Sequence, residues 1–116
     1  MDTFDYVIVG AGSAGCVLAN RLSANGKYTV CILEAGPPDW HPMIHIPAGF
    51  MKWLDDKTFN WRYQTEPSEW TGGRAIPVPR GKTLGGSSSI NGNVYNRGHR
   101  NDFNNWAQSG NKGWGY

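Results

Sequence analysis

Three glycines near the start of the chain have the spacing of a phosphate-binding turn. Gly10, Gly12 and Gly15 form the pattern G-x-G-x-x-G between an apolar run, DYVIVG, and a stretch with helical periodicity. In that context the first glycine permits a tight turn, the second lets a pyrophosphate approach the backbone, and the third lets the helix pack closely on the strand. The N–H groups of Ser13 and Ala14, at the positive end of the helix, are then expected to face phosphate oxygens.

An acidic residue follows at the distance that such a turn requires. Glu34 ends a second apolar run, YTVCILE, roughly 20 residues after Gly15, where a carboxylate accepts hydrogen bonds from ribose hydroxyls. A carboxylate there also repels a 2′-phosphate, which disfavours NADP. NAD and FAD share the adenosine diphosphate half, so the pattern leaves both open. The structural alternative is that the glycines form an ordinary turn and Glu34 is a solvated strand end.

The elements that hold these residues predict an α/β fold. Residues 1–36 are interpreted as a Rossmann-like βαβ dinucleotide-binding unit, with strands at 5–10 and 28–34 and a helix that begins near Ser13 and stops at Asn25-Gly26. Both strand segments are continuous apolar runs, which is typical of parallel strands buried on both faces.

The rest of the chain is less regular. Residues 37–80 contain all seven prolines and little periodicity, so they are expected to form loops and extended segments that cover something else, without a second sheet. A helix is predicted from Ile90 to about Gly98. Residues 99–116 are polar and glycine-punctuated, and are taken as the start of a further region.

The stretch RGKTLGGSSSINGNVYNRG, residues 80–98, has two possible interpretations. A Gly-Gly-Ser-Ser-Ser run is typical of a flexible linker. The same small residues also suit a backbone against which a flat, bulky group must lie. Leu84 and Ile90 flank the run, and these apolar side chains favour a packed segment over a free one.

Taken together, VIVGAGSAG, LEAGP and this stretch resemble the glucose-methanol-choline family of FAD-dependent alcohol oxidoreductases. The resemblance covers essentially the whole chain, which is similar to the N-terminal segment of a larger two-domain enzyme. HPMIHIPAGF and NWRYQTEP resemble the bacterial alcohol and choline dehydrogenases more than the fungal sugar oxidases. Within the third stretch, the positions that carry the family pattern are Lys82, Leu84, Gly85, Gly86, Ser87, Ser88, Ile90, Asn91, Tyr95 and Gly98.

The resemblance implies an incomplete FAD-binding domain over residues 1–116, in which residues 81–98 contact the flavin. Some family members attach the flavin covalently through a histidine at the position that Ile90 occupies here, so FAD is expected to be held noncovalently. The expected cofactor-binding residues, from the glycine pattern and the resemblance together, are Gly10, Gly12, Ser13, Ala14, Gly15, Glu34, Ala35, Leu84, Gly86, Ser87, Asn91, Gly92, Asn93 and Val94.

The resemblance implies that a hydride is transferred from an alcohol carbon to the flavin while a base takes the hydroxyl proton. The reduced flavin then passes its electrons to oxygen or another acceptor. The base implied is a histidine beyond Tyr116, so no catalytic residue is assigned to this chain. His41, His45 and His99 are interpreted as structural or surface groups, and no metal site is expected. Trp61, in FNWRY, is placed near the wall of the active site.

Composition narrows the remaining alternatives. The net charge of +2 comes from scattered residues, which argues against nucleic acid as a partner. Cys16 and Cys31 are interpreted as buried thiols, and the absence of a long apolar stretch favours a cytoplasmic protein, with peripheral membrane contact left open. The alternatives to alcohol oxidation are an NAD-dependent dehydrogenase, a family relative with lyase or light-driven activity, and a non-catalytic nucleotide-binding fragment. The expected partners are the remainder of the polypeptide, or a complementary fragment, and a small alcohol.

Overall fold

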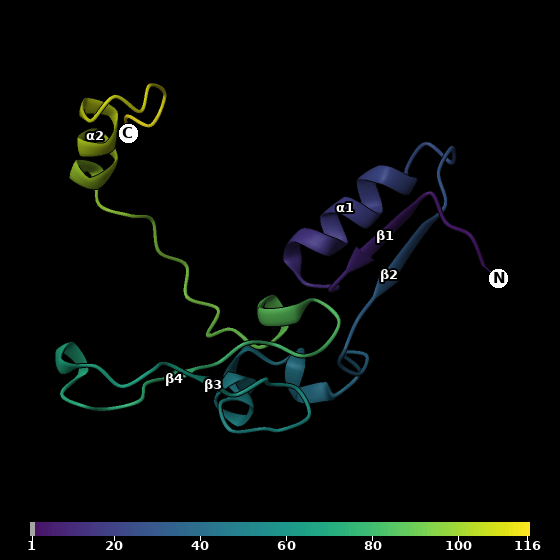
Figure 1. Ribbon diagram of the computed structural model, residues 1–116, viewed down its shortest axis with the longest axis horizontal. Coiled ribbons are helices and arrows are strands. Elements are labelled where there is room, and N and C mark those ends of the chain that lie inside the picture. Colours follow the sequence, from purple (N-terminus) through teal and green to yellow (C-terminus); the bar gives the residue numbers. More distant parts are fainter. Residues whose placement is uncertain (1) are drawn as a thin grey trace.

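The computed structural model describes residues 2–116 and begins with a βαβ unit. Strands β1 (Tyr6–Val9) and β2 (Val30–Leu33) pair in parallel, with Tyr6 opposite Val30 and Val9 opposite Leu33. Helix α1 (Ser13–Ser23) connects them and runs alongside both (Figure 1). The predicted order of strand, glycine turn, helix and parallel strand is confirmed.

The two strands are more exposed than the sequence predicts. Val7 is 58% exposed and Val9 is 85% exposed, because α1 is the only described helix that packs on β1 and β2 and each strand has a single neighbour. The expectation that Cys16 and Cys31 are both buried is also wrong for this chain. Cys16 is exposed and Cys31 is partly buried, and both are free thiols.

A hydrogen-bonded pair fixes the sheet at the end opposite the glycine turn. Asp5 accepts hydrogen bonds from the backbone N–H of Thr29 (2.7 Å) and from its hydroxyl (2.8 Å). These bonds hold the pKa of the Asp5 carboxyl below its ordinary value of 3.8, and the bond from the Thr29 backbone N–H contributes most. This contact sets where the two strands begin to pair.

Residues 37–80 form a second body made of short turns and a hairpin. The 3₁₀ helices η1 (Pro42–Ile44) and η2 (Pro47–Trp53) lead to a two-stranded antiparallel sheet of β3 (Tyr63–Gln64) and β4 (Pro77–Val78). This hairpin corrects the expectation that the region has no sheet of its own. Trp53 is 1% exposed and packs edge-on against His41 and Phe59, which gives this body its core.

The helix predicted from Ile90 to Gly98 is wrong. That stretch is irregular, because Asn93 has a left-handed φ of 52° and its N–H bonds to the side chain of Asn91 in a local turn. The helix lies further on, as α2 (Arg100–Gln108), where the ring of His99 caps its N-terminus. Figure 1 shows α2 at the far end of an extended segment, away from α1. Within residues 2–116, no helix combines the length and apolar character needed to cross a bilayer.

Candidate functional site

The glycine turn has the backbone geometry that its spacing predicts. Gly10 has a φ of 97°, in the left-handed region that favours glycine, and its N–H donates to the carbonyl oxygen of Leu33 (2.7 Å). Gly15 is buried against Gly10, so a Cβ at Gly15 would collide with the Gly10 carbonyl. These two glycines bring the start of α1 close to the ends of both strands.

The N-terminus of α1 is open toward solvent. Its N-cap residue, Gly12, supplies no side-chain acceptor, and the first turn of the helix contains no acidic residue. Among the described residues, no hydrogen-bond acceptor contacts the N–H groups of Ser13 and Ala14. Unsatisfied N–H groups and the positive end of a helix dipole together favour an anion.

Glu34 ties the glycine turn to the end of β2. Its Oε2 accepts a hydrogen bond from the Ala11 N–H (2.8 Å), and its Oε1 accepts one from the Gly36 N–H (3.0 Å). The sequence indicated a ribose-binding carboxylate, and this structural role was not foreseen. Each carboxylate oxygen retains a further lone pair, so the two roles are compatible.

The Gly-Gly-Ser segment is packed against the βαβ unit, which contradicts the linker interpretation. The Gly85 N–H donates to the Ala11 carbonyl (2.7 Å), and Gly12 and Gly85 form an isolated parallel bridge. Thr83 is fully buried, and its hydroxyl donates to the Pro37 carbonyl (2.7 Å). The backbone of this segment therefore forms one side of the turn that carries Gly12.

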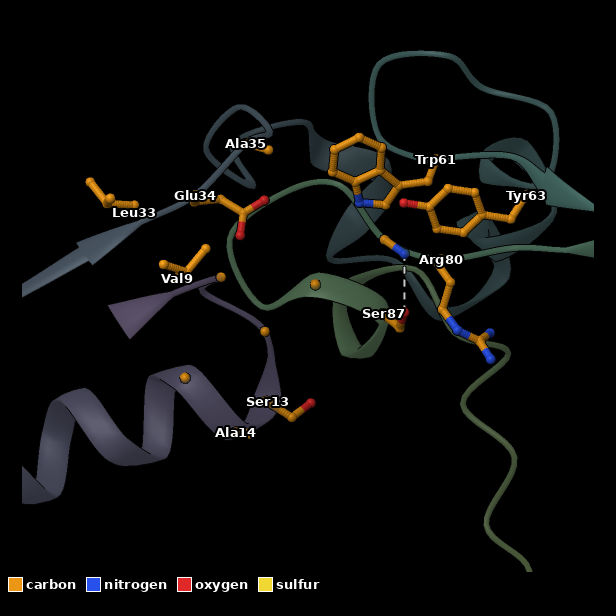
Figure 2. Close-up of a pocket in the computed structure, with 15 residues that line it drawn as sticks. Val9, Ser13, Ala14, Leu33, Glu34, Ala35, Trp61, Tyr63, Arg80 and Ser87 are labelled. Atoms are coloured by element: carbon orange, nitrogen blue, oxygen red, sulfur yellow. Dashed lines mark hydrogen bonds between the residues drawn. The ribbon is translucent and has the colours of Figure 1, made fainter. Parts of the chain in front are cut away.

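The serine hydroxyls of this segment stabilise its own bend. Ser88 and Ser89 donate to the carbonyls of Gly85 and Leu84, each at 2.6 Å, and hold the short helix η4 (Gly86–Ser89). Ser87 accepts a hydrogen bond from the Gly81 N–H (3.0 Å) (Figure 2). The hydroxyls keep a small-residue backbone rigid, which a linker of the same composition would not be.

The close contact between Gly36 and Lys82 leads to a prediction. A Cβ at Gly36 would collide with the backbone carbonyl of Lys82, so Gly36→Ala should displace the docked segment and destabilise the protein by about 3 kcal/mol. Differential scanning calorimetry of the complete enzyme measures this as a lower melting temperature. Gly115→Ala is the control, because the nearest atom to its Cβ is 3.9 Å away. An unchanged melting temperature for Gly36→Ala would contradict the packing described.

A cavity of about 570 Å³, open to solvent, lies between four parts of the chain. They are the glycine turn, the end of β2, the start of β3 and the docked Gly-Gly-Ser segment. Figure 2 shows Ser13 and Ala14 on one side and Trp61 and Tyr63 on the opposite side. Most of the expected cofactor residues lie together here: Gly10, Gly12, Ser13, Ala14, Gly15, Glu34, Ala35, Gly86 and Ser87.

The remaining expected residues lie elsewhere. Asn91, Gly92, Asn93 and Val94 border a separate hollow of about 420 Å³ together with Tyr95. Leu84 borders neither hollow and is 38% exposed. The structure therefore brings together the part of the prediction that rests on the two glycine-rich turns, and places the segment after Ile90 apart from it.

Sequence reasoning missed five residues that line the main cavity, namely Val9, Leu33, Tyr63, Arg80 and Gly81. The first two are strand ends beside the glycine turn, and their position could have been read from the βαβ pattern. The other three reach the cavity through the β3–β4 hairpin, whose strands of two residues are too short to show a period in the sequence. Trp61 was expected near the active-site wall and does line the cavity.

The wall opposite the helix N-terminus is aromatic and basic. The rings of Trp61 and Tyr63 are stacked, with centroids 5.9 Å apart and planes 6° apart. Arg80 lines the same wall, and the Lys82 ammonium, which is not part of the cavity lining, lies 5.0 Å from the centre of the Trp61 ring. Arg80 on this side and the free N–H groups of Ser13 and Ala14 on the other favour an anionic ligand with flat groups.

None of the three histidines lines the cavity. His41 packs against Trp53 and accepts a hydrogen bond from the Met43 N–H (3.1 Å), and His45 Nε2 lies 2.6 Å from the Asp39 carbonyl oxygen. His99 caps α2. In the part of the chain that the structure describes, no group of three or more His, Cys, Asp or Glu side chains is placed to bind a metal ion.

The cavity fits a dinucleotide on three observations. The glycines at positions 12 and 86 present no side chain to it, the N–H groups at the start of α1 are available to phosphate, and Glu34 lies at the end of β2 where a ribose would be held. The aromatic wall supplies flat surface for a ring system.

Two curated relatives are similar over 97% of this chain. An alcohol dehydrogenase [acceptor] from Pseudomonas putida is 56% identical over 113 residues, and an oxygen-dependent choline dehydrogenase from Brucella suis is 52% identical over 112 residues. The chain spans 20% of the length of each.

Solved structures agree with this similarity. Pyridoxine 4-oxidase from Mesorbium loti superposes with a TM-score of 0.79 at 41% identity, covering 98% of this chain and 22% of that one. A formate oxidase from Aspergillus oryzae superposes at 0.77 with 40% identity, covering 97% of this chain and 20% of that one. The family described as GMC oxidoreductase matches residues 4–116, and the chain therefore belongs to the GMC oxidoreductase family.

Proposed function

We propose that this chain is the FAD-binding part of a larger enzyme that oxidises an alcohol to an aldehyde. The observation that carries the proposal is the docking of the Gly-Gly-Ser segment against the glycine turn, which builds one cavity from two glycine-rich backbones. Family membership supports FAD as the cofactor. When bound, FAD supplies the hydride acceptor for alcohol oxidation.

The residues of the chain act by binding and orienting the cofactor. Ser13 and Ala14 offer backbone N–H groups to the pyrophosphate, while Gly12 and Gly86 leave room for it. Glu34 accepts hydrogen bonds from the ribose. Asn91, Gly92, Asn93 and Val94 lie along the flavin ring if the complete enzyme closes the segment after Ile90 over the cavity.

Proton transfer from the alcohol requires a base. No histidine lines the described cavity, and its one carboxylate, Glu34, is held by the N–H groups of Ala11 and Gly36. The base is proposed to lie in the remainder of the enzyme. The substrate is proposed to be a small alcohol, as the names of the alcohol and choline dehydrogenases suggest. Free Cys16 and Cys31 favour a reducing, cytoplasmic setting.

The alternatives account for less of the structure. An NAD-dependent dehydrogenase would use the βαβ unit but has no role for the docked Gly-Gly-Ser segment. A relative with lyase or light-driven activity would share the cavity, and differs only in residues outside this chain. A non-catalytic fragment would not need both glycine-rich backbones to meet at one cavity.

The test of the function is reduction of the bound flavin by alcohols. The complete enzyme is purified, made anaerobic and mixed with primary alcohols or choline, and flavin absorbance near its visible maximum is recorded. Bleaching by one of these alcohols, and not by a matched ether, is the expected result. A yellow protein that no alcohol bleaches would favour the lyase or light-driven alternative, and a protein that binds NAD but no flavin would favour the dehydrogenase.

Noncovalent attachment of FAD is a separate prediction. Ile90 is 7% exposed and has no nucleophilic atom, and neither histidine nor cysteine is among the residues that line the cavity. Precipitating the holoenzyme with acid should therefore release the yellow colour into the supernatant. Colour that stays with the washed pellet would identify a covalent anchor in the rest of the enzyme.

A further inference from the structure

Asn60 is a buried side chain whose hydrogen-bonding groups are all engaged by backbone. It is 2% exposed. Its Nδ2 donates to the carbonyls of Trp53 (2.9 Å) and Leu54 (2.8 Å), where η2 ends. Its Oδ1 accepts from the N–H groups of Arg62 (2.9 Å) and Arg80 (3.0 Å).

These four bonds join three separate stretches of chain behind the basic and aromatic wall. Arg62 begins the path into β3, and Arg80 follows β4, so one amide oxygen holds both sides of the hairpin at its base. The neighbouring backbone agrees: Asn60 and Gly81 form an isolated antiparallel bridge, and the Trp61 N–H donates to the Arg80 carbonyl (2.9 Å).

The bond to Arg62 also holds an unusual backbone conformation. Arg62 has a φ of 57°, in the left-handed region, which is unfavourable for a residue with a Cβ. This residue separates Trp61 from Tyr63, whose rings are stacked on the cavity wall. The orientation of the stack therefore depends on a conformation that the Asn60 side chain stabilises.

Asn60 itself does not line the cavity, whereas Trp61, Arg80 and Gly81 do. We propose that Asn60 is a positioning residue for the cofactor site, because its side chain sets the wall formed by Trp61 and Arg80 against the glycine turn. This inference rests on the proposed function, since it takes FAD as the group that the wall faces.

The test compares FAD affinity with stability in the complete enzyme. Asn60→Ala removes all four bonds, and FAD affinity of the apoprotein, measured by flavin fluorescence quenching, should fall on the order of 30-fold. Hydrogen exchange of peptides that contain Arg62 and Arg80 should become faster in the same apoprotein. Thr29→Val is the control, because it removes the two hydrogen bonds of the Thr29 hydroxyl to Asp5, at the end of the β1–β2 sheet away from the cavity.

Asn60→Asp separates positioning from a general loss of stability. It keeps an oxygen that accepts from Arg62 and Arg80 but places its second oxygen against two carbonyls, so it should lower the melting temperature at least as much as Asn60→Ala. A positioning role predicts that Asn60→Asp nevertheless binds FAD more tightly than Asn60→Ala. If affinity simply follows melting temperature across the three variants, the proposal is wrong.

The remaining outcomes are also decisive. FAD affinity in Asn60→Ala within about twofold of the parent would overturn the proposal. If Asn60→Ala does not fold, Asn60→Ser takes its place, because its hydroxyl can still bond to the Arg62 N–H while the bonds to Trp53 and Leu54 are lost. The proposal then requires weaker FAD binding in Asn60→Ser and unchanged binding in Thr29→Val. Failure of the parent enzyme to bind any FAD would instead refute the proposed function, and the exchange measurement on Arg62 and Arg80 would still report whether Asn60 holds the wall.

Discussion

Replacing Gly12 with valine should abolish retention of FAD by the complete enzyme while leaving the apoprotein folded. Gly12 lines the cavity at the start of α1, and its φ of −76° is one that any residue adopts. The nearest atom to a Cβ at this position is the Gly86 Cα, 4.0 Å away, so the Cβ itself meets no backbone atom and the side chain extends into the space between the two glycine backbones. That space is where the pyrophosphate must approach.

The expected loss in FAD affinity is at least on the order of 100-fold, equivalent to about 2.7 kcal/mol. Visible absorbance of the purified protein and titration of the apoprotein with FAD measure it, and circular dichroism reports whether the fold remains. Ala24→Val, at the exposed C-terminal end of the same helix, is the control. A Gly12→Val enzyme that keeps its yellow colour through purification would show that the pyrophosphate does not bind at this turn.

The 116-residue chain expressed alone should not form a cooperative, active unit. A compact protein of this length has a radius of gyration of about 13 Å, whereas that of this chain is 18.5 Å. Large apolar side chains remain in water on every part of it, including Val9 (85%), Trp70 (96%) and Val94 (84%). Ordering each residue costs about 1 to 2 kcal/mol of backbone entropy, which so little burial does not offset.

Expression of the 116-residue chain tests this prediction through three measurements. Amide hydrogen exchange should show little protection, a dye for exposed apolar surface should bind strongly, and alcohol should not reduce added FAD. Adding the remainder of the enzyme as a separate polypeptide, as a control, should restore protection if the exposed strands are covered by it. Cooperative unfolding together with alcohol-dependent turnover in the isolated chain would contradict both the prediction and the placement of the base outside this chain.

Local patterns in the sequence were sufficient to predict the side of the site that the glycine turn and the start of α1 form. The spacing of Gly10, Gly12 and Gly15 between two element types predicts the turn, the helix start and the parallel strand, and all three are present. These features are readable because each depends on residues a few positions apart: a left-handed φ needs glycine, and helices and strands have distinct apolar periods. The packed Gly-Gly-Ser segment was anticipated from the family resemblance and from the flanking residues Leu84 and Ile90, of which only Ile90 is buried.

Two features could be seen only in the tertiary structure. They are the cavity wall formed by Trp61, Tyr63 and Arg80, and the position of the segment after Ile90. Tyr63 and Arg80 reach the cavity because β3 and β4 pair across a long loop and because Asn60 bonds to both sides. Strands of two residues have no measurable period, and a buried asparagine looks in sequence like any loop asparagine. Asn93 likewise adopts a left-handed conformation, so residues 91–98 are irregular and extended where a helix was predicted. Contacts between residues distant in sequence are set by the free energy of packing the whole chain, and no local pattern records them.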